Sequence, residues 1–415
     1  MLAIIAAALL FRVALLSLVH NPGLHDPIHY FNLGRRLAEG QGFTVDYVWH
    51  YSRIPLDISH GIDHWMPVAG VAAAAGISLG GASPIAALTV FVLAGALAPL
   101  LTFFAAKQLA LADETALIAA LLAAFIPDLV LSSLRTDTTA LNAVFICGAI
   151  LLLNDGLQHR RRVNFMLCGA LTGLAYLTRN DALLFFPMLA AILVIRMCFG
   201  SRHPRYRDAF FAASLTIVAF LVVIAPWLWR NLQETGLLGT AETSRMFFMV
   251  EQSDHYAYGP AITWESMLER RSIGELLYFR LFQFAAAIKQ IVVSLAFPLN
   301  ILMLAGAIRL LRGRLPARLS TLEPALIWLV GILLVYPLLL PLKSQAGSFE
   351  KAFLTVVPLL IPLAAVPIDR SFHRSIWYRG WPSAVFCKSS GRPSLPILIT
   401  AAYRSWWMHW IACPM

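Results

Sequence analysis

The sequence predicts an all-α protein that crosses a membrane with about ten helices. The chain has 415 residues, of which 59% are hydrophobic and only 13% are charged. Soluble domains carry about 25% charged residues, so water alone could not solvate this surface. The apolar runs are continuous, which excludes a membrane β-barrel, because barrel strands alternate apolar and polar residues. A polytopic helical bundle is the fold class that remains.

Ten segments are candidate spans, since a membrane helix needs about 20 mostly apolar residues. The five strongest contain no charge: residues 84–106, 209–229, 291–308, 324–342 and 352–368. The five weaker segments contain a charge or are short: residues 2–19, 115–134, 138–153, 163–178 and 182–195. We interpret residues 2–19 as the first span rather than a signal peptide, because no basic region precedes them.

Basic residues fall in every second connection, at Lys107 and in residues 159–162, 202–207 and 309–318. Short cytoplasmic loops are enriched in Lys and Arg, which places these connections and the N-terminus inside. Two long loops, residues 20–83 and 230–284, then face the outside. The formal charge of +10 follows from these scattered connections and forms no nucleic-acid-binding face. We therefore expect membrane lipids around the chain and no nucleic acid partner.

The chain divides into a transmembrane domain, residues 1–368, and an atypical tail, residues 369–415. In the tail, Trp, Arg, Ser and Pro crowd together and the apolar runs are short. One interpretation is a disordered or truncated segment. The other is an interfacial segment, because Trp and Arg favour the headgroup zone. The five cysteines form no CxxC pair, so neither a disulfide framework nor a thiolate metal site is predicted.

The first long loop opens with His25, Asp26 and Pro27, followed by apolar residues at helical spacing and by Gly40 and Gly42. Asp and Pro are favoured where helices begin and Gly where they end. We therefore expect a short amphipathic helix on the outer membrane face. Asp26 is either the N-cap of this helix or an acid held at the membrane surface as a base or metal ligand. A carboxylate fully engaged in capping would be a poor base.

A cluster of His60, Asp63 and His64 follows in the same loop. Their spacing could bring imidazole and carboxylate groups onto one helical turn. A metal site needs three or four ligands with supporting partners, so metal binding is one interpretation of this cluster. The other is an interfacial loop that Trp65 anchors at the headgroups.

Two further acids stand at the ends of spans on the same predicted side. Asp137 is either the N-cap of the helix that begins at Thr138 or a functional acid, because a charge at a membrane boundary is costly. Arg179 and Asp181 form a very short turn, in which they either neutralise one another or bind substrate.

Basic residues complete the predicted site. Arg230 follows two tryptophans at the point where the chain is predicted to leave the membrane. Aromatic anchoring is the alternative interpretation of that segment. Lys343 and Lys351 bracket an outer turn, where either could bind an anionic headgroup or a phosphate.

The convergence of acids and bases on one side favours a site for a lipid-borne anionic substrate. The sequence contains no Gly-rich phosphate loop of the Walker or dinucleotide type, so no nucleotide cofactor is predicted. The alternative is a transporter or flippase of a lipid-linked or small anionic solute, although the midplane charges typical of transporters are scarce. A non-catalytic membrane protein is a third hypothesis, which the tail motivates.

The chain resembles the GT-C class of polyprenyl-phosphate-dependent membrane glycosyltransferases over about residues 1–368. Four features carry the resemblance: the acid after the first span with its LAEGQGF turn, the RTD element, the LTRND turn and the PWLWRN exit. The families most similar in pattern are the dolichyl-phosphate-mannose protein mannosyltransferases and the bacterial lipid A aminoarabinose transferases.

The resemblance implies transfer of a hexosyl or pentosyl group from a polyprenyl phosphate to a lipid, glycan or protein acceptor. The reaction would invert the anomeric carbon, and the site would face away from the cytoplasm. Apart from the resemblance, the bare N-terminus fits a bacterial inner membrane better than an endoplasmic reticulum membrane. Asp26 would be the general base, and Asp137 its partner in positioning or metal binding. A divalent cation at these carboxylates is also implied. Candidate cations for the departing phosphate are Arg230, Lys343 and Lys351.

Overall fold

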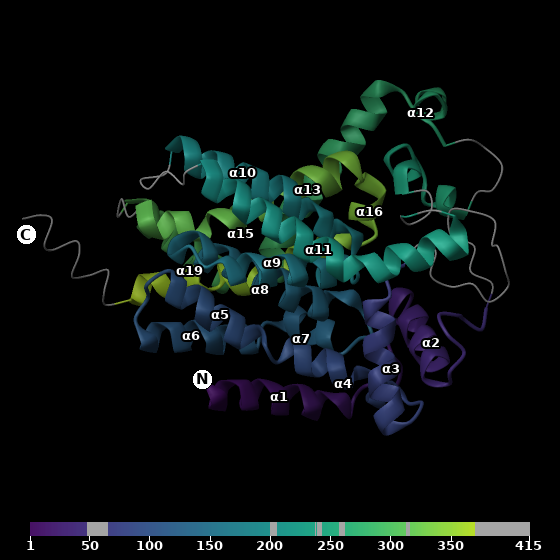
Figure 1. Cartoon of the computed structure of the whole chain (residues 1–415), viewed down its shortest axis with the longest axis horizontal. Coiled ribbons are helices and arrows are strands. Elements are labelled where there is room, and N and C mark those ends of the chain that lie inside the picture. Colours follow the sequence, from purple (N-terminus) through teal and green to yellow (C-terminus); the bar gives the residue numbers. More distant parts are fainter. Residues whose placement is uncertain are drawn as a thin grey trace, which may run out of the picture. The chain divides into compact units, whose positions relative to one another are not determined.

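The computed structural model describes residues 1–47, 65–199, 206–236, 238, 243–256, 262–312 and 316–369. Helices make up the regular structure of these residues, which confirms the predicted all-α class (Figure 1). Contacts within the chain separate Met1–Ser371 from Phe372–Met415, and the description that follows concerns the first unit. Apart from Asp369, the predicted tail lies outside the described residues.

The first half of the chain contains a run of mostly short helices that ends near residue 199. These are α1 (Leu2–Leu16), α2 (Asp26–Ala38), α3 (Val68–Gly80), α4 (Pro84–Gly95), α5 (Ala98–Gln108), α6 (Asp113–Ala124), α7 (Pro127–Ser133), α8 (Thr138–His159), α9 (Arg162–Tyr176), η1 (Asn180–Leu184) and α10 (Phe185–Phe199).

The second half begins with the longest helix. Its elements are α11 (Tyr206–Thr235), η2 (Thr243–Phe247), η3 (Gln252–Tyr256), α12 (Trp264–Arg270), α13 (Ile273–Ser294), α14 (Leu299–Arg312), α15 (Pro316–Leu334), η4 (Val335–Leu339), α16 (Pro341–Gln345), α17 (Ser348–Leu354), α18 (Val357–Leu360), α19 (Pro362–Ala365) and η5 (Val366–Ile368).

Among the described residues, six helices are long and apolar enough to cross a membrane, and up to eight if each of two bent pairs is one span. The sequence predicts about ten. Part of the difference lies in α1 and α9, which are helices of only 15 residues. A helix rises about 1.5 Å per residue, so each is shorter than the hydrocarbon core unless the bilayer thins around it.

The predicted span 115–134 is broken into α6 and α7, which meet at an angle of 58°. Pro127 causes the break, because proline has no backbone N–H and restricts the residue before it to extended conformations. Ile126 accordingly adopts φ −62° and ψ 122°. α17 and the last helical turns form the second bent pair, at 46°.

The prediction of one span over residues 291–308 is wrong. α13 ends at Ser294 and α14 begins at Leu299, with Ala296 at φ 56° between them. A positive φ and the missing N–H of Pro298 both interrupt a helical hydrogen-bond ladder, which a hydropathy scan does not detect. α13 begins at Ile273, within the predicted outer loop 230–284, and is itself a candidate span.

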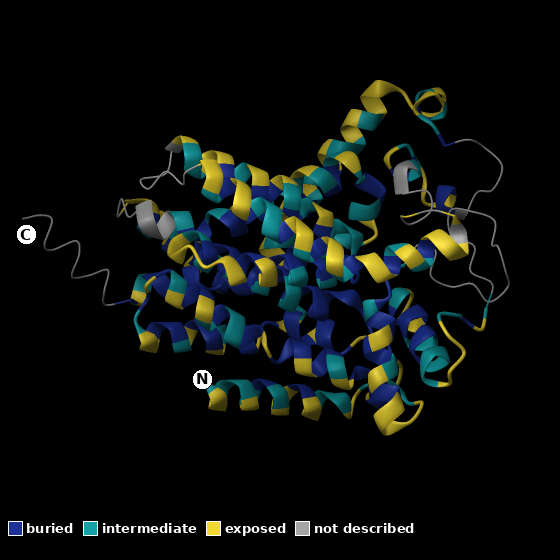
Figure 2. Cartoon of the chain, in the orientation of Figure 1, coloured by how far each residue is buried: buried dark blue, intermediate teal, exposed yellow. Residues whose placement is uncertain are grey.

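Burial divides the helices into a central set and a peripheral set (Figure 2). In α8, 67% of the span window is buried, whereas in α13 only 11% is buried. The exposed side chains of α13 include Leu277, Tyr278, Leu281 and Phe282. Large exposed apolar patches are rare on soluble monomers, so these side chains fit contact with lipid tails.

The predicted amphipathic helix after the first span is α2. Its apolar face packs against α3 and buries Tyr30 and Leu33. Gly34 permits this approach, because a Cβ at this position would lie 2.6 Å from the Cβ of Ala73. α2 is thereby fixed to the bundle at the point where Asp26 begins the helix.

Candidate active site

Asp26 is the first residue of α2, and its carboxylate points to another part of the chain. The N-cap position belongs to His25, which has φ 59° and makes no capping bond through its side chain. The capping interpretation of Asp26 is therefore wrong. Lys351 Nζ instead donates to Asp26 Oδ2 over 2.9 Å. An acid in the first helical turn also gains from the helix dipole.

The capping interpretation of Asp137 is confirmed, its functional role stays a prediction, and its two oxygens have different partners. Asp137 is the N-cap of α8, where Oδ1 accepts hydrogen bonds from Thr138 N at 2.5 Å and Thr138 Oγ1 at 3.1 Å. Its Oδ2 pairs with Lys351 Nζ at 2.9 Å. Burial alone would raise the pKa of Asp137, but Lys351 and Arg179 hold it below the usual range.

One ammonium group therefore bridges two carboxylates that are 111 positions apart in the sequence, with Lys351 itself on α17. We call Asp26, Lys351 and Asp137 the carboxylate–lysine cluster. The Asp26 side chain is 31% exposed and that of Asp137 only 6%. A substrate can therefore reach Asp26, whereas Asp137 is covered.

Thr136 holds the two acids together, and the sequence analysis missed it. Its hydroxyl donates to Pro27 O over 2.5 Å, and its backbone N–H donates to Pro22 O over 3.1 Å. Thr136 is fully buried. Thr136 therefore links the segment before α8 to Pro22 and Pro27, which lie before and after Asp26 in the sequence. Its place beside Asp137 in the RTD element was the available signal.

Arg179 and Asp181 neutralise one another, as one of the two interpretations predicts. Arg179 Nε and Nη2 donate to the same Asp181 oxygen over 2.9 and 2.8 Å. Tyr336 adds its hydroxyl, which donates to this oxygen over 2.6 Å and accepts from Arg179 Nη2 over 2.9 Å. Arg179 Nη1 reaches Thr138 Oγ1 at 3.4 Å, which links this network to Asp137. The substrate-binding role of Arg179 and Asp181 stays a prediction.

Tyr336 was not predicted as a site residue. It lies in an apolar segment, where a single tyrosine carries no local signal of function. The second oxygen of Asp181, Oδ1, is buried and has no hydrogen-bond partner among the described residues. A buried carboxylate oxygen without a donor is costly, so this position could receive a donor from a bound molecule.

The remaining predicted cations lie in different surroundings. Burial lowers the pKa of Lys343 on α16 to about 8, although the charge of Asp26 opposes this shift. The charge of Lys343 therefore interacts with the charges of the carboxylate–lysine cluster. Arg230 on α11 lies over the ring of Trp227, 5.0 Å from the ring centroid, which agrees with the aromatic anchoring interpretation.

The predicted metal ligands are only partly described. His60, Asp63 and His64 lie outside the described residues. Within the described part of the chain, no group of three or more His, Cys, Asp or Glu side chains could hold a metal ion. The two described carboxylates of the predicted set share the ammonium of Lys351.

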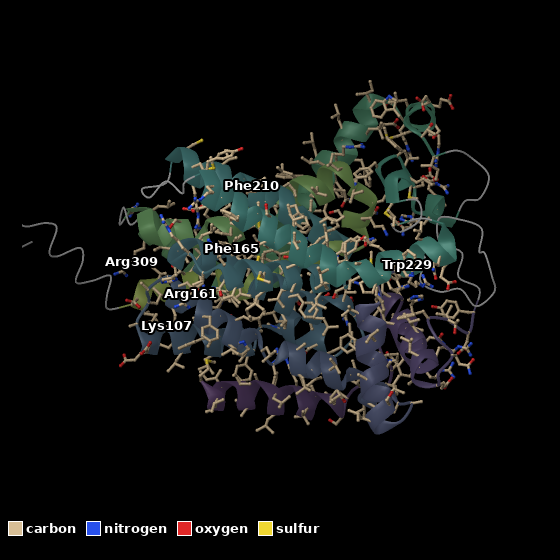
Figure 3. All side chains as sticks on the ribbon, in the orientation of Figure 1. Lys107, Arg161, Phe165, Phe210, Trp229 and Arg309 are labelled. Atoms are coloured by element: carbon tan, nitrogen blue, oxygen red, sulfur yellow. The ribbon has the colours of Figure 1, made fainter. Side chains whose placement is uncertain are left out.

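Three basic residues from the connections used to predict the orientation lie at one end of the helices (Figure 3). In Figure 3, Lys107, Arg161 and Arg309 lie at this end, and Trp229 lies toward the other. Figure 1 shows α2 and α16 on the side of Trp229 as well. The elements that carry Asp26 and Lys343 are therefore remote from the basic end.

The fold is similar to the folds of known proteins. The crystal structure of ArnT from Cupriavidus metallidurans bound to undecaprenyl phosphate matches with a TM-score of 0.61 at 18% identity, over 91% of this chain and 62% of that chain. The archaeal oligosaccharyltransferase AglB from Archaeoglobus fulgidus, in complex with an inhibitory peptide and a dolichol-phosphate, matches with a TM-score of 0.57 at 15% identity. That match covers 99% of this chain and 54% of AglB.

The chain thus spans about 62% of the length of ArnT and 54% of that of AglB. No sequence among the curated proteins matches it significantly. Residues 63–229 match the family model of dolichyl-phosphate-mannose-protein mannosyltransferases. This range includes Asp137, Arg179 and Asp181, whereas Asp26 and Lys351 lie outside it. The resemblance predicted from the sequence is confirmed: the chain has the GT-C membrane fold, and its residues 63–229 resemble the dolichyl-phosphate-mannose-protein mannosyltransferases.

Proposed function

We propose that the chain is a membrane glycosyltransferase that moves a sugar from a polyprenyl-phosphate carrier to an acceptor, with inversion at the anomeric carbon. The carrier is supported by the two structural neighbours, one bound to undecaprenyl phosphate and the other to a dolichol-phosphate. The observation that carries the proposal is the carboxylate–lysine cluster, in which one acid is partly exposed and the other is a buried N-cap.

Asp26 is the base in this reaction because it is the acid that a substrate can reach. The acceptor oxygen attacks the anomeric carbon, and the bond from this carbon to the phosphate oxygen breaks. The phosphate leaves with the electron pair, and the acceptor proton passes to the Asp26 carboxylate. A single displacement of this kind inverts the configuration. Asp137 is buried and caps α8, so it positions Lys351 rather than accepting the proton.

Lys343 is the cation best placed to meet the departing phosphate. Its charge interacts with Asp26, so it lies near the base. A preorganised cation in a buried site stabilises the negative charge that develops on the leaving group. Arg230 lies over an aromatic ring and has the geometry of a membrane-interface anchor.

We place the site at the extracytoplasmic face of a bacterial inner membrane. The support is the gathering of Lys107, Arg161 and Arg309 at the other end of the helices (Figure 3), since basic loops stay in the cytoplasm. Labelling single cysteines with a membrane-impermeant maleimide in intact cells tests this. Label at position 25 and none at position 161 is expected, and the reverse pattern contradicts the orientation.

The test of the activity uses purified membranes that contain the chain and a set of radiolabelled polyprenyl-phosphate sugars. Release of label from the lipid carrier, above membranes without the chain, is the expected result. NMR of the product should show the anomeric configuration opposite to that of the donor. Retention of configuration would contradict the single displacement, and no release from any donor would contradict the transferase.

The two bent helix pairs favour one other function. Transporters use broken helices to form their binding sites, and α6–α7 and α17–α18 are broken in this way. A transporter or flippase would move a lipid-linked or anionic solute without any covalent product. Flux of a fluorescent polyprenyl phosphate across vesicles, with no change in its sugar, would favour this alternative over the transferase.

A further inference from the structure

The resemblance to GT-C enzymes implies a divalent cation at Asp26 and Asp137, and the geometry of the two residues disagrees. The Oδ2 atom of each carboxylate is 2.9 Å from the same Lys351 Nζ. Charge-assisted N–H···O bonds have lengths of about 2.7–2.9 Å, so both contacts are fully formed. A Mg²⁺ or Ca²⁺ ion bridging these oxygens would lie about 2.0–2.6 Å from each. It would occupy the space of the ammonium group.

Lys351 is held firmly in this position by the helix that carries it. Its neighbours Phe349, Ala352 and Phe353 are buried, and the two phenyl rings are stacked with their centroids 6.3 Å apart. One turn later, Thr355 O accepts a hydrogen bond from Cys147 Sγ of α8 over 2.9 Å. α17 is thereby fixed to the same helix that Asp137 caps.

The ammonium also supplies the electrostatic role that a metal would have. Two carboxylates close together repel each other and disfavour joint ionisation, unless a positive charge lies between them. Lys351 contributes one such charge. Asp26 and Asp137 contribute two negative charges, so one negative charge remains in the cluster. A divalent ion would cancel both, whereas the lysine leaves Asp26 with charge to accept a proton.

We propose that Lys351 takes the place of a divalent cation between Asp26 and Asp137, so that this chain positions its base with an internal ammonium group. Lys351 is then a positioning residue, and other cations stabilise the departing phosphate. Its catalytic consequence rests on the proposed transferase function, but its cation-replacing role does not.

Binding of Mn²⁺ to the purified full-length chain tests the replacement without any transfer assay. Free Mn²⁺ is measured by electron paramagnetic resonance for the wild type, Asp26→Asn, Lys351→Ala and the double variant Asp26→Asn/Lys351→Ala. The wild type and Asp26→Asn should bind Mn²⁺ equally, because the wild type should have no Mn²⁺ site that involves Asp26. Lys351→Ala should gain one, and the double variant should lose it. A wild-type site that depends on Asp26, or no gain in a folded Lys351→Ala chain, overturns the proposal.

Transfer supplies the second readout if a donor has been identified. Lys351→Ala should lower the rate about 100-fold, and added ethylammonium or Mn²⁺ should restore part of it. Lys107→Ala is the matched control, because Lys107 pairs with the exposed Asp113 and lies at the basic end. Chelators should leave wild-type transfer unchanged. Loss of wild-type transfer in EDTA with recovery in Mn²⁺ overturns the proposal. If no donor is used at all, the proposed function fails while the Mn²⁺ comparison still decides the role of Lys351.

Discussion

The double role of Asp137 predicts different stabilities for two substitutions at one position. Asp137→Asn keeps an oxygen that can cap α8 but removes the charge that faces Lys351. Asp137→Ala removes both. A hydrogen bond to a charged group contributes about 1.5–3 kcal/mol, and an N-cap contributes about 1 kcal/mol. Lys351 keeps Asp26 as its partner in both variants, so the larger cost of an uncompensated buried charge does not arise.

We therefore expect the free energy of unfolding to fall by about 2 kcal/mol in Asp137→Asn and by about 3 kcal/mol in Asp137→Ala. Reversible unfolding in mixed micelles, followed by tryptophan fluorescence, measures both values. Asp113→Asn is the control, because its side chain is 76% exposed and surface ion pairs contribute little. Equal losses in the two Asp137 variants would refute the capping role. A loss below about 0.5 kcal/mol in Asp137→Asn would refute a buried ion pair.

Three further predictions test the surroundings of the cluster. Tyr336→Phe removes the hydroxyl between Arg179 and Asp181 and should destabilise the chain by about 1.5–3 kcal/mol, measured in the same unfolding assay; an unchanged midpoint contradicts the network. Thr136→Val removes the donor to the carbonyl of Pro27 and should cost about 1–2 kcal/mol and lower the transfer rate; full activity at reduced stability contradicts its positioning role. Transfer should fall as pH rises through about 8, because Lys343 loses its proton there, and Lys343→Arg should remove this limb; a profile that the variant leaves unchanged assigns the limb to another group.

Local patterns predict much of the membrane domain. The apolar run beginning at Thr138 and the long run ending near Trp229 correspond to α8 and α11, because burial in lipid and helical backbone pairing leave no other spanning structure. The helix after the first span begins at Asp26, where Asp and Pro predict it. The breaks at Pro127 and Pro298 were missed, since a hydropathy window averages over single residues.

The members of the carboxylate–lysine cluster were identified as candidates from the sequence, but their pairing was not. Asp26, Asp137 and Lys351 were each identified from their places at the ends of apolar segments. Lys351 was assigned to the phosphate, whereas it bridges the two acids. Asp26 and Lys351 are 325 positions apart, and no local pattern encodes a contact of that range. Thr136 and Tyr336 act through single hydroxyls, which carry no periodic signal.

The central claim is that Asp26 accepts the proton of the acceptor. The most direct measurement compares the single-turnover rate of sugar release from the lipid carrier for the intact chain, Asp26→Asn and the control Asp113→Asn, at matched membrane abundance. Removal of a general base lowers a rate by about 10²–10⁴-fold, so we expect such a loss in Asp26→Asn and none in Asp113→Asn. Release by Asp26→Asn at the rate of the intact chain would contradict the claim.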